Sequence, residues 1–249
     1  MNTKASMKQN RRGFLVAAGS AFAALFLGGQ IRAVRAAEPS RPKIGIIGSG
    51  RIGGTLGGLW LKAGHEVMFS SLDLEHDKAL AARLGANAHA GTPKEAAAFG
   101  EVLLISVPYA ALPQLGKDLV DAIKGKVLLD TCNPIPARDG DMAIEAKAKG
   151  TGIASPQLLP GARLVRAFNS VGYTMLQSEA HRGGERVAIP LAGDDAEALA
   201  IAVRLVQEAG FEAVVVGSLV RAREFDPGTP VFGKALTAAE LRRGLGVNP

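Results

Sequence analysis

The sequence predicts an α/β fold, a doubly wound and mostly parallel sheet with a small C-terminal lobe. Short apolar runs alternate with segments of helical periodicity, which is typical of parallel strands joined by helices. Val102–Val107, apolar except for Ser106, and Val127–Leu129 are apolar runs, as expected of strands that helices cover on both faces. The first apolar run also ends in a glycine-rich turn that passes directly into a helical pattern.

Each expected element follows from its own local signals. The expected strands are, in order, Lys43–Ile47, Glu66–Ser70, Ala86–His89, Val102–Val107, Val127–Leu129, Leu164–Phe168, Val187–Leu191 and Val214–Val216. The expected helices are Arg51–Ala63, Asp77–Leu84, a helix that begins at Pro93 with Thr92 as N-cap, Asp194–Ala209 with Asp194 as N-cap, and a terminal helix whose capping box joins Thr237 to Glu240. Ligands bind beyond the carboxyl ends of parallel strands, so the residues after each strand are the candidate site.

Residues 1–36 have the features of a signal peptide. The segment Asn10-Arg11-Arg12-Gly13-Phe14-Leu15 is a twin-arginine pattern, and the apolar run that follows is too short to span a bilayer comfortably. Small residues at Val34 and Ala36 favour cleavage before Ala37. We therefore expect export through the twin-arginine translocase, to the periplasm or otherwise out of the cytoplasm. An uncleaved anchor or a basic arm is the alternative.

Without this leader the chain carries almost no net charge. The formal net charge of the whole chain is +6, and the leader holds six basic residues and no acidic one: Lys4, Lys8, Arg11, Arg12, Arg32 and Arg35. The high isoelectric point therefore gives no reason to expect a nucleic-acid partner. Beyond the leader no apolar stretch is long enough to span a membrane. We expect a dinucleotide-binding domain over 37–155, and a C-terminal part over 156–249 that completes the sheet and adds a small helical lobe.

The turn after the first predicted strand is the main candidate for a ligand-binding site. Its residues are Gly48, Ser49, Gly50, Arg51, Ile52 and Gly53, a G-x-G-x-x-G pattern between a predicted strand and a predicted helix. In such a Rossmann-type unit the first glycine makes the tight turn and the second lets backbone N–H groups approach a pyrophosphate. The third lets the helix pack against the strand. The sequence therefore predicts a bound nicotinamide dinucleotide.

The end of the second strand favours NADP(H) over NAD(H). Sites for NAD(H) usually place an Asp or Glu there, but this chain has Ser70 and Ser71. Two hydroxyls can donate to a 2′-phosphate, and Arg51 adds a cation. Two alternatives remain open: the serines only turn the chain, or Asp73 serves a ribose.

Several motifs occur in the order seen in one family. After the glycine turn come Phe69-Ser70-Ser71, Ser106-Val107-Pro108, Asn133-Pro134, Leu159-Pro160-Gly161-Ala162 and Arg166-Ala167-Phe168-Asn169-Ser170. This order resembles the NADPH-dependent deazaflavin (coenzyme F-420) oxidoreductases and the related reductase domain of the six-transmembrane metalloreductases. The resemblance implies that Ser106, Val107 and Pro108 line the pyrophosphate and nicotinamide ribose, that backbone groups around Ala167 hold the carboxamide, and that Asn133, Pro134, Phe168 and Asn169 contribute to the same site. One departure is Leu72, where many relatives have an arginine that clamps phosphate; Arg51, His76 or Lys78 are the cations that could replace it.

The resemblance implies hydride transfer between NADP(H) and a deazaflavin or flavin acceptor. Such a reaction needs positioning of two rings more than acid–base groups, so no catalytic side chain is expected. We expect Cys132 to be a packed thiol, no metal site, and single surface or turn histidines. A homodimer is implied by the small members of the family. The alternatives are an NADP(H)-binding sensor or partner subunit without turnover, a flavin-mediated metal-chelate reductase, and a dehydrogenase of a small alcohol or acid.

Overall fold

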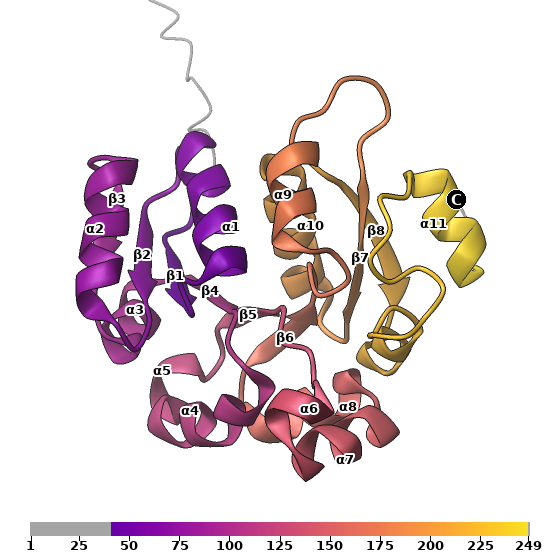
Figure 1. Cartoon of the computed structure of the whole chain (residues 1–249), viewed down its shortest axis with the longest axis horizontal. Coiled ribbons are helices and arrows are strands. Elements are labelled where there is room, and N and C mark those ends of the chain that lie inside the picture. The colour runs from indigo at the N-terminus through magenta and orange to yellow at the C-terminus, as the bar shows by residue number, and fades with distance from the viewer. Residues whose placement is uncertain (1–40, 249) are drawn as a thin grey trace, which may run out of the picture. The chain divides into compact units, whose positions relative to one another are not determined.

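A single sheet of eight strands runs through the part of the chain that the computed structural model describes, residues 41–248 (Figure 1). The order across the sheet is β3-β2-β1-β4-β5-β6-β7-β8. The strands are β1 Ile44–Ile47, β2 Val67–Ser70, β3 Ala88–Ala90, β4 Val102–Ile105, β5 Val127–Asp130, β6 Arg163–Arg166, β7 Ala188–Gly193 and β8 Glu212–Gly217. Strands β1 to β6 are mutually parallel, whereas β7 pairs antiparallel with β6 and parallel with β8. The predicted fold class, a doubly wound and mostly parallel sheet, is confirmed.

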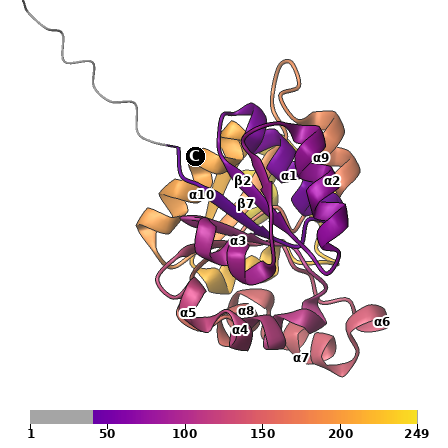
Figure 2. The same ribbon diagram turned by 90° about the vertical axis from the view of Figure 1, so that its left-hand side faces the viewer.

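Helices cover both faces of this sheet. The α-helices are α1 Arg51–Lys62, α2 Leu74–Leu84, α3 Pro93–Phe99, α4 Leu112–Asp118, α5 Val120–Ile123, α6 Pro136–Asp139, α7 Asp141–Lys149, α8 Thr151–Leu158, α9 Tyr173–Glu179, α10 Ala196–Glu208 and α11 Ala238–Leu245. Two 3-10 turns, η1 Tyr109–Ala111 and η2 Leu219–Glu224, complete the elements. Figure 2 shows α4, α6, α7 and α8 gathered on one side of the sheet.

Alternating side chains of the central strands build two separate cores. Ile46 and Leu104 join the core beneath α1, α2, α9 and α10, where Trp60 is fully buried and its indole N–H donates to the carbonyl of Leu205. Their strand neighbours Ile47 and Leu103 join the opposite core, beneath α3, α4, α5, α7 and α8. A third cluster lies between β7, β8 and α11. This period-2 alternation is what a sheet covered on both faces requires.

Two of the predicted helix starts are confirmed by their capping boxes. The capping boxes of Thr92 with Glu95 and of Thr237 with Glu240 are both formed. Two helix starts were predicted wrongly. Helix α2 begins at Leu74 instead of Asp77, because the side chain of Asp73 accepts from the backbone N–H of His76.

Helix α10 is the second wrong start. Its N-cap is Asp195, whose side chain accepts from Ala198, and not Asp194. Asp194 accepts from the backbone N–H of Leu219 instead, so it ties the end of β7 to η2. The helices between residues 109 and 158, and α9, were not predicted.

His65 also differs from the prediction that the histidines are single surface or turn residues. Its ring is fully buried between the carbonyl of Pro42, 2.9 Å from Nδ1, and the carboxylate of Glu208, 2.8 Å from Nε2. The site joins Pro42, before β1, to Glu208 at the end of α10, and local sequence did not indicate it.

In residues 41–248 no helix combines the length and the apolar composition that a bilayer-spanning segment requires. The predicted signal peptide lies outside the described residues.

Candidate dinucleotide-binding site

The glycine turn is held by contacts that tolerate no side chain at two positions. Gly48 has φ of 101°, and a Cβ there would overlap the carbonyl of Ser106 at the end of β4. A Cβ on Gly53 would overlap the carbonyl of Gly48. The N–H groups of Gly48 and Ser49 both donate to the carbonyl of Ser70, at 2.8 and 3.0 Å. The turn is therefore fixed between β1, β2 and β4.

Unlike Gly48 and Gly53, Gly50 has no packing contact that would exclude a side chain at its position. A Cβ at this position would meet nothing within 4 Å, and the φ of −63° lies outside the left-handed region. Gly50 is the N-cap of α1, makes no side-chain cap bond, and is followed by a first turn without an acidic residue. Helices α2, α3, α10 and α11, in contrast, are each capped by a side chain.

An uncapped helix start leaves N–H groups free and carries partial positive charge. An open space above a glycine at such a start is the cradle that a phosphate requires. The residues present therefore fit a dinucleotide pyrophosphate.

A cavity of about 270 Å³ lies on the β4 and β5 side of this turn. It brings together seven of the predicted site residues: Gly50, Arg51, Ile52, Ser106, Val107, Pro108 and Asn133. Thr131, Cys132, Ile135 and Arg138 complete the lining, and these four were not predicted as site residues. The carboxyl ends of β1, β4 and β5 thus form one wall, as the topology of a parallel sheet requires.

Arg138 is the charged residue that sequence reasoning missed. Its guanidinium donates to both carboxylate oxygens of Asp139 and to the carbonyl of Asn133, at 2.8 to 2.9 Å. Desolvation would raise the pKa of Asp139, but the bonds from Arg138 and from two backbone N–H groups outweigh it and lower that pKa. Pro136 could have predicted a helix here, because proline is common in the first turn of a helix, and this helix, α6, contains Arg138.

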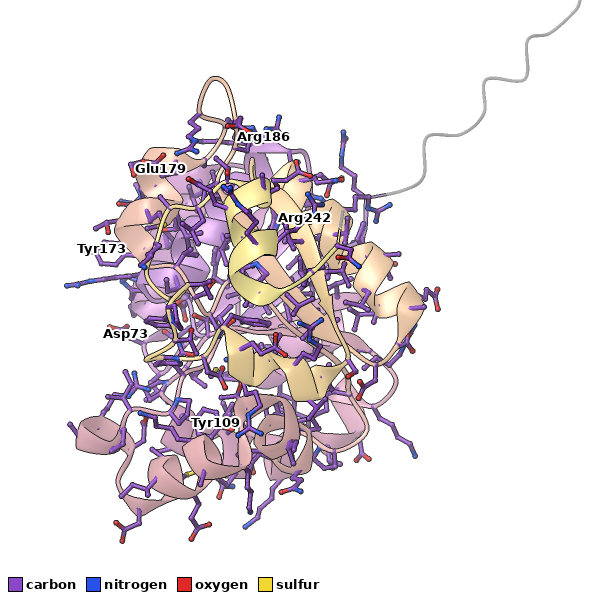
Figure 3. The ribbon with its side chains drawn as sticks, turned by 90° about the vertical axis from the view of Figure 1, so that its right-hand side faces the viewer. Asp73, Tyr109, Tyr173, Glu179, Arg186 and Arg242 are labelled. Carbon is purple, nitrogen blue, oxygen red and sulfur yellow. The ribbon has the colours of Figure 1, made fainter. Side chains whose placement is uncertain are left out.

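A second cavity, of about 510 Å³, lies on the other side of α1, between α1, α2 and α9. Ser49, Gly50 and Arg51 form its end at the glycine turn. Its basic side chains are Arg51, Lys62, His76 and Arg83, and no Asp or Glu lines it. The guanidinium of Arg51 also lies over the ring of Tyr173, 4.9 Å from its centroid. Figure 3 shows Tyr173 and Asp73 on the same edge of the structure.

The serines after β2 are turned into the protein. Ser70 is fully buried and its hydroxyl donates to the carbonyl of Ile46 at 2.7 Å, so its side chain has no free donor for a ligand. The hydroxyl of Ser71 donates to the carboxylate of Asp77 at 2.9 Å. Leu72 is fully exposed, and Asp73 is occupied as the N-cap of α2.

The remaining predicted residues lie behind the smaller cavity. Ala167 and Phe168 are buried, and the ring of Phe168 packs against Trp60 and Phe211 in the core. Neither residue lines either cavity, and the backbone N–H of Ala167 donates to the carbonyl of Asp130 at 3.3 Å. The side-chain amide of Asn133 donates to the carbonyl of Asn169 at 2.7 Å, which links the ends of β5 and β6. Pro134 follows Asn133 and does not line either cavity.

A buried ion-pair network supports this wall. The guanidinium of Arg166 is fully buried, 2.8 Å from Asp130 and 3.3 Å from Asp226. Burial opposes its charge, but the two carboxylates outweigh burial and raise the pKa of Arg166. One of its nitrogens also donates to the carbonyl of Cys132 at 2.7 Å. The network therefore holds the segment from Asp130 to Asn133 against β6.

Cys132 is a packed thiol, as predicted. It is buried, and burial together with the nearby charge of Asp130 raises its pKa well above the usual thiol range. Within residues 41–248 no three His, Cys, Asp or Glu side chains gather in a group that could hold a metal ion.

Comparisons with known proteins find similarity to NADP-dependent reductases. Residues 43–134 match the family model described as NADP oxidoreductase, coenzyme F420-dependent. The F420-dependent NADP reductase of Methanothermobacter marburgensis is 29% identical over 183 residues, which cover 68% of this chain and 81% of that protein. Metalloreductase STEAP3 of Rattus norvegicus is 29% identical over 188 residues, which cover 74% of this chain but only 36% of the rat protein. The chain thus spans about a third of that relative.

A solved structure extends the similarity beyond the matched residues. The hypothetical protein SMa0349 of Sinorhizobium meliloti has a TM-score of 0.66 and 25% identity, covering 79% of this chain and 96% of that one. The matched segment contains the glycine turn, the serines after β2 and the Ser106-Val107-Pro108 turn. The chain is thus similar to the coenzyme F420-dependent NADP oxidoreductases over residues 43–134, and it is also similar to the metalloreductase STEAP3.

Proposed function

We propose that this chain transfers a hydride between NADP(H) and a deazaflavin or flavin acceptor. The observation that carries the proposal is the start of α1, where Gly50 leaves an open space before an uncapped helix. Free N–H groups and the helix dipole would hold the pyrophosphate there. The match of residues 43–134 to an NADP oxidoreductase family model, and the similarity to an F420-dependent NADP reductase, support NADP(H) as the dinucleotide.

The larger cavity, whose basic side chains are Arg51, Lys62, His76 and Arg83, supports binding of the adenosine end of NADP(H) there; we call it the basic cavity. With Ser70 and Ser71 donating inward and Leu72 lacking a cation, the free donors near the end of β2 are Arg51 and His76. Neither has a carboxylate partner within ion-pair distance in the described residues. We assign the 2′-phosphate to this pair in place of the serines.

The smaller cavity, of about 270 Å³, supports binding of the nicotinamide end of NADP(H) there. Ser106, Val107 and Pro108 form one side of it, and Thr131 and Asn133 form another. When bound, the dinucleotide supplies the hydride, and the chain orients its ring and excludes water. The ionisable groups in the lining are Arg51, Arg138 and Cys132, whose raised pKa keeps it a thiol near neutral pH. This lining suits hydride transfer, which needs no proton donor from the chain.

The acceptor is the finer part of the proposal. The relative from Methanothermobacter marburgensis is named for F420, and the rat relative for metal reduction. A deazaflavin or flavin fits a two-electron hydride step directly. A metal chelate accepts single electrons and would need a flavin between it and NADPH, so it ranks second.

Export through the twin-arginine translocase belongs to the same proposal. The motif Asn10-Arg11-Arg12-Gly13-Phe14-Leu15 supports it, with cleavage before Ala37. Proteins that use this route fold before they cross the membrane, so the dinucleotide would travel bound to the protein in the periplasm. We also propose that residues 37–155 and 156–249 form the two parts of the exported protein and that it forms a homodimer.

The test is a binding titration followed by an acceptor series. The full chain is titrated with NADPH and NADH while the fluorescence of the nicotinamide is recorded. Saturable NADPH binding is expected, and the bound NADPH should then be oxidised by a deazaflavin or by FMN under anaerobic conditions. Binding without oxidation by a deazaflavin, FMN or FMN with ferric chelate would favour the sensor alternative. No binding of either nucleotide would overturn the proposal.

A further inference from the structure

A buried carboxylate lies directly beneath the proposed adenosine site. Asp77, in the first turns of α2, is fully buried, and no Lys, Arg or His of the described residues lies within ion-pair distance of it. Its partners are two hydroxyls: Ser49 Oγ donates to one carboxylate oxygen and Ser71 Oγ to the other, the latter at 2.9 Å. Buried charges are usually paired with a cation, so an arrangement with two hydroxyls alone is costly to maintain.

The two hydroxyls belong to the two segments that bracket this site. Ser49 precedes Gly50 in the glycine turn and lines the basic cavity, and Ser71 follows β2. A carboxylate accepts hydrogen bonds and donates none, so both hydroxyl protons point inward to Asp77. The oxygen of Ser71 also accepts from the backbone N–H of Asp73 at 3.1 Å, and the carbonyl of Asp73, at 3.2 Å, is a second and longer acceptor for its proton. Neither serine therefore has a proton left to donate to a phosphate.

We infer that Asp77 is a positioning residue that weakens the preference of this chain for a 2′-phosphorylated dinucleotide. It acts through Ser49 and Ser71, whose protons it withdraws, and through its own negative charge near a dianionic phosphate. A ribose with a free 2′-hydroxyl suffers neither effect. This inference rests on the proposed NADP(H) site. It explains why Ser71, at the end of β2, is not available to a phosphate, whereas Ser70 is already bound to the carbonyl of Ile46.

The test compares Asp77→Asn with a matched control in the same helix. Asparagine keeps the size of the side chain and removes its charge. Its amide can donate, so at least one serine proton loses its carboxylate acceptor; for Ser71 the other acceptor in reach is the carbonyl of Asp73, at 3.2 Å. Glu75→Gln removes the same charge two residues earlier, from a side chain that is 82% exposed. The probes are NADPH and NADH, together with 2′,5′-ADP and 5′-AMP, which report on the adenosine end alone.

In Asp77→Asn the ratio of NADPH to NADH affinity should rise about tenfold, and the ratio for 2′,5′-ADP to 5′-AMP should rise in parallel. Glu75→Gln should change neither ratio by more than about twofold. Adding Ser71→Ala to Asp77→Asn should remove much of the gain, because the released hydroxyl is then absent. A merely structural role would weaken all four ligands together. An unchanged ratio in Asp77→Asn, or an equal rise in Glu75→Gln, would overturn the inference.

Ser71→Ala in the otherwise unchanged chain gives a second test if Asp77→Asn does not fold. Since the Ser71 proton is already committed to Asp77, this variant should keep its NADPH to NADH ratio within about twofold. A selective loss of NADPH affinity would show that Ser71 donates to the phosphate, which contradicts the inference. Failure of the unchanged chain to bind any of the probes would instead refute the proposed function.

Discussion

Substitution of Gly50 by alanine should weaken NADPH binding while leaving the fold intact. A methyl group at Gly50 meets no atom of the chain within 4 Å, so Gly50→Ala should leave the fold intact. The loss of a glycine N-cap costs at most about 1 kcal/mol of the free energy of unfolding. Gly53→Ala is the matched contrast, because its methyl would overlap the carbonyl of Gly48 and approach Ile46 Cγ2 to 3.0 Å. That overlap should cost about 1–3 kcal/mol.

The same methyl group at Gly50 occupies the space from which a phosphate approaches the start of α1. Losing one charge-assisted hydrogen bond from a backbone N–H costs about 1.5–3 kcal/mol, so the Kd for NADPH should rise about 10- to 100-fold. Urea denaturation without nucleotide measures the free energy of unfolding, and nicotinamide fluorescence measures the Kd. The reasoning is refuted if Gly50→Ala binds NADPH within about threefold of the unchanged chain, or if it loses as much stability as Gly53→Ala.

Three further predictions concern the support of the site. Arg166→Met leaves Asp130 and Asp226 without their cation and should lower the free energy of unfolding by about 3–5 kcal/mol in urea denaturation; a loss below about 1 kcal/mol would contradict the role of the network. Burial raises the pKa of Tyr109 from 10.0 to about 12, so the unfolded chain loses this proton first and stability should fall as pH rises between those values; Tyr109→Phe should show a shallower fall, and an equal slope would contradict this. Iodoacetamide should label Cys132 slowly in the native chain and rapidly in urea, whereas rapid native labelling would show that the thiol is accessible.

The position of Tyr109 shows why its titration reports on folding. The side chain is fully buried among the helices on the far side of β4, where its hydroxyl lies 3.1 Å from that of Ser155 in α8 (Figure 3). Ionisation would leave a charge in this apolar core. The loss of stability at high pH therefore reports on the burial of Tyr109 and its contact with Ser155.

Local sequence determined the fold class and the centre of the site. The glycine turn, the capping boxes at Thr92 and Thr237, and the apolar runs each depend on a few neighbouring residues, so they could be recognised without knowing the tertiary structure. The convergence of Gly50, Ser106 and Asn133 on one cavity followed from the rule that carboxyl ends of parallel strands meet at one edge.

Only the tertiary structure decided which partner each polar side chain near the site binds. Ser70 and Ser71 follow β2 as predicted, yet their hydroxyls donate inward, to Ile46 and Asp77. Arg166 finds Asp226 sixty residues away, a pairing that depends on β6 and η2 packing together. Sequence fixes which groups are present near the end of each strand. The choice of partner depends on contacts between distant segments, because hydrogen bonds of buried groups are satisfied by whatever the packed chain brings within reach.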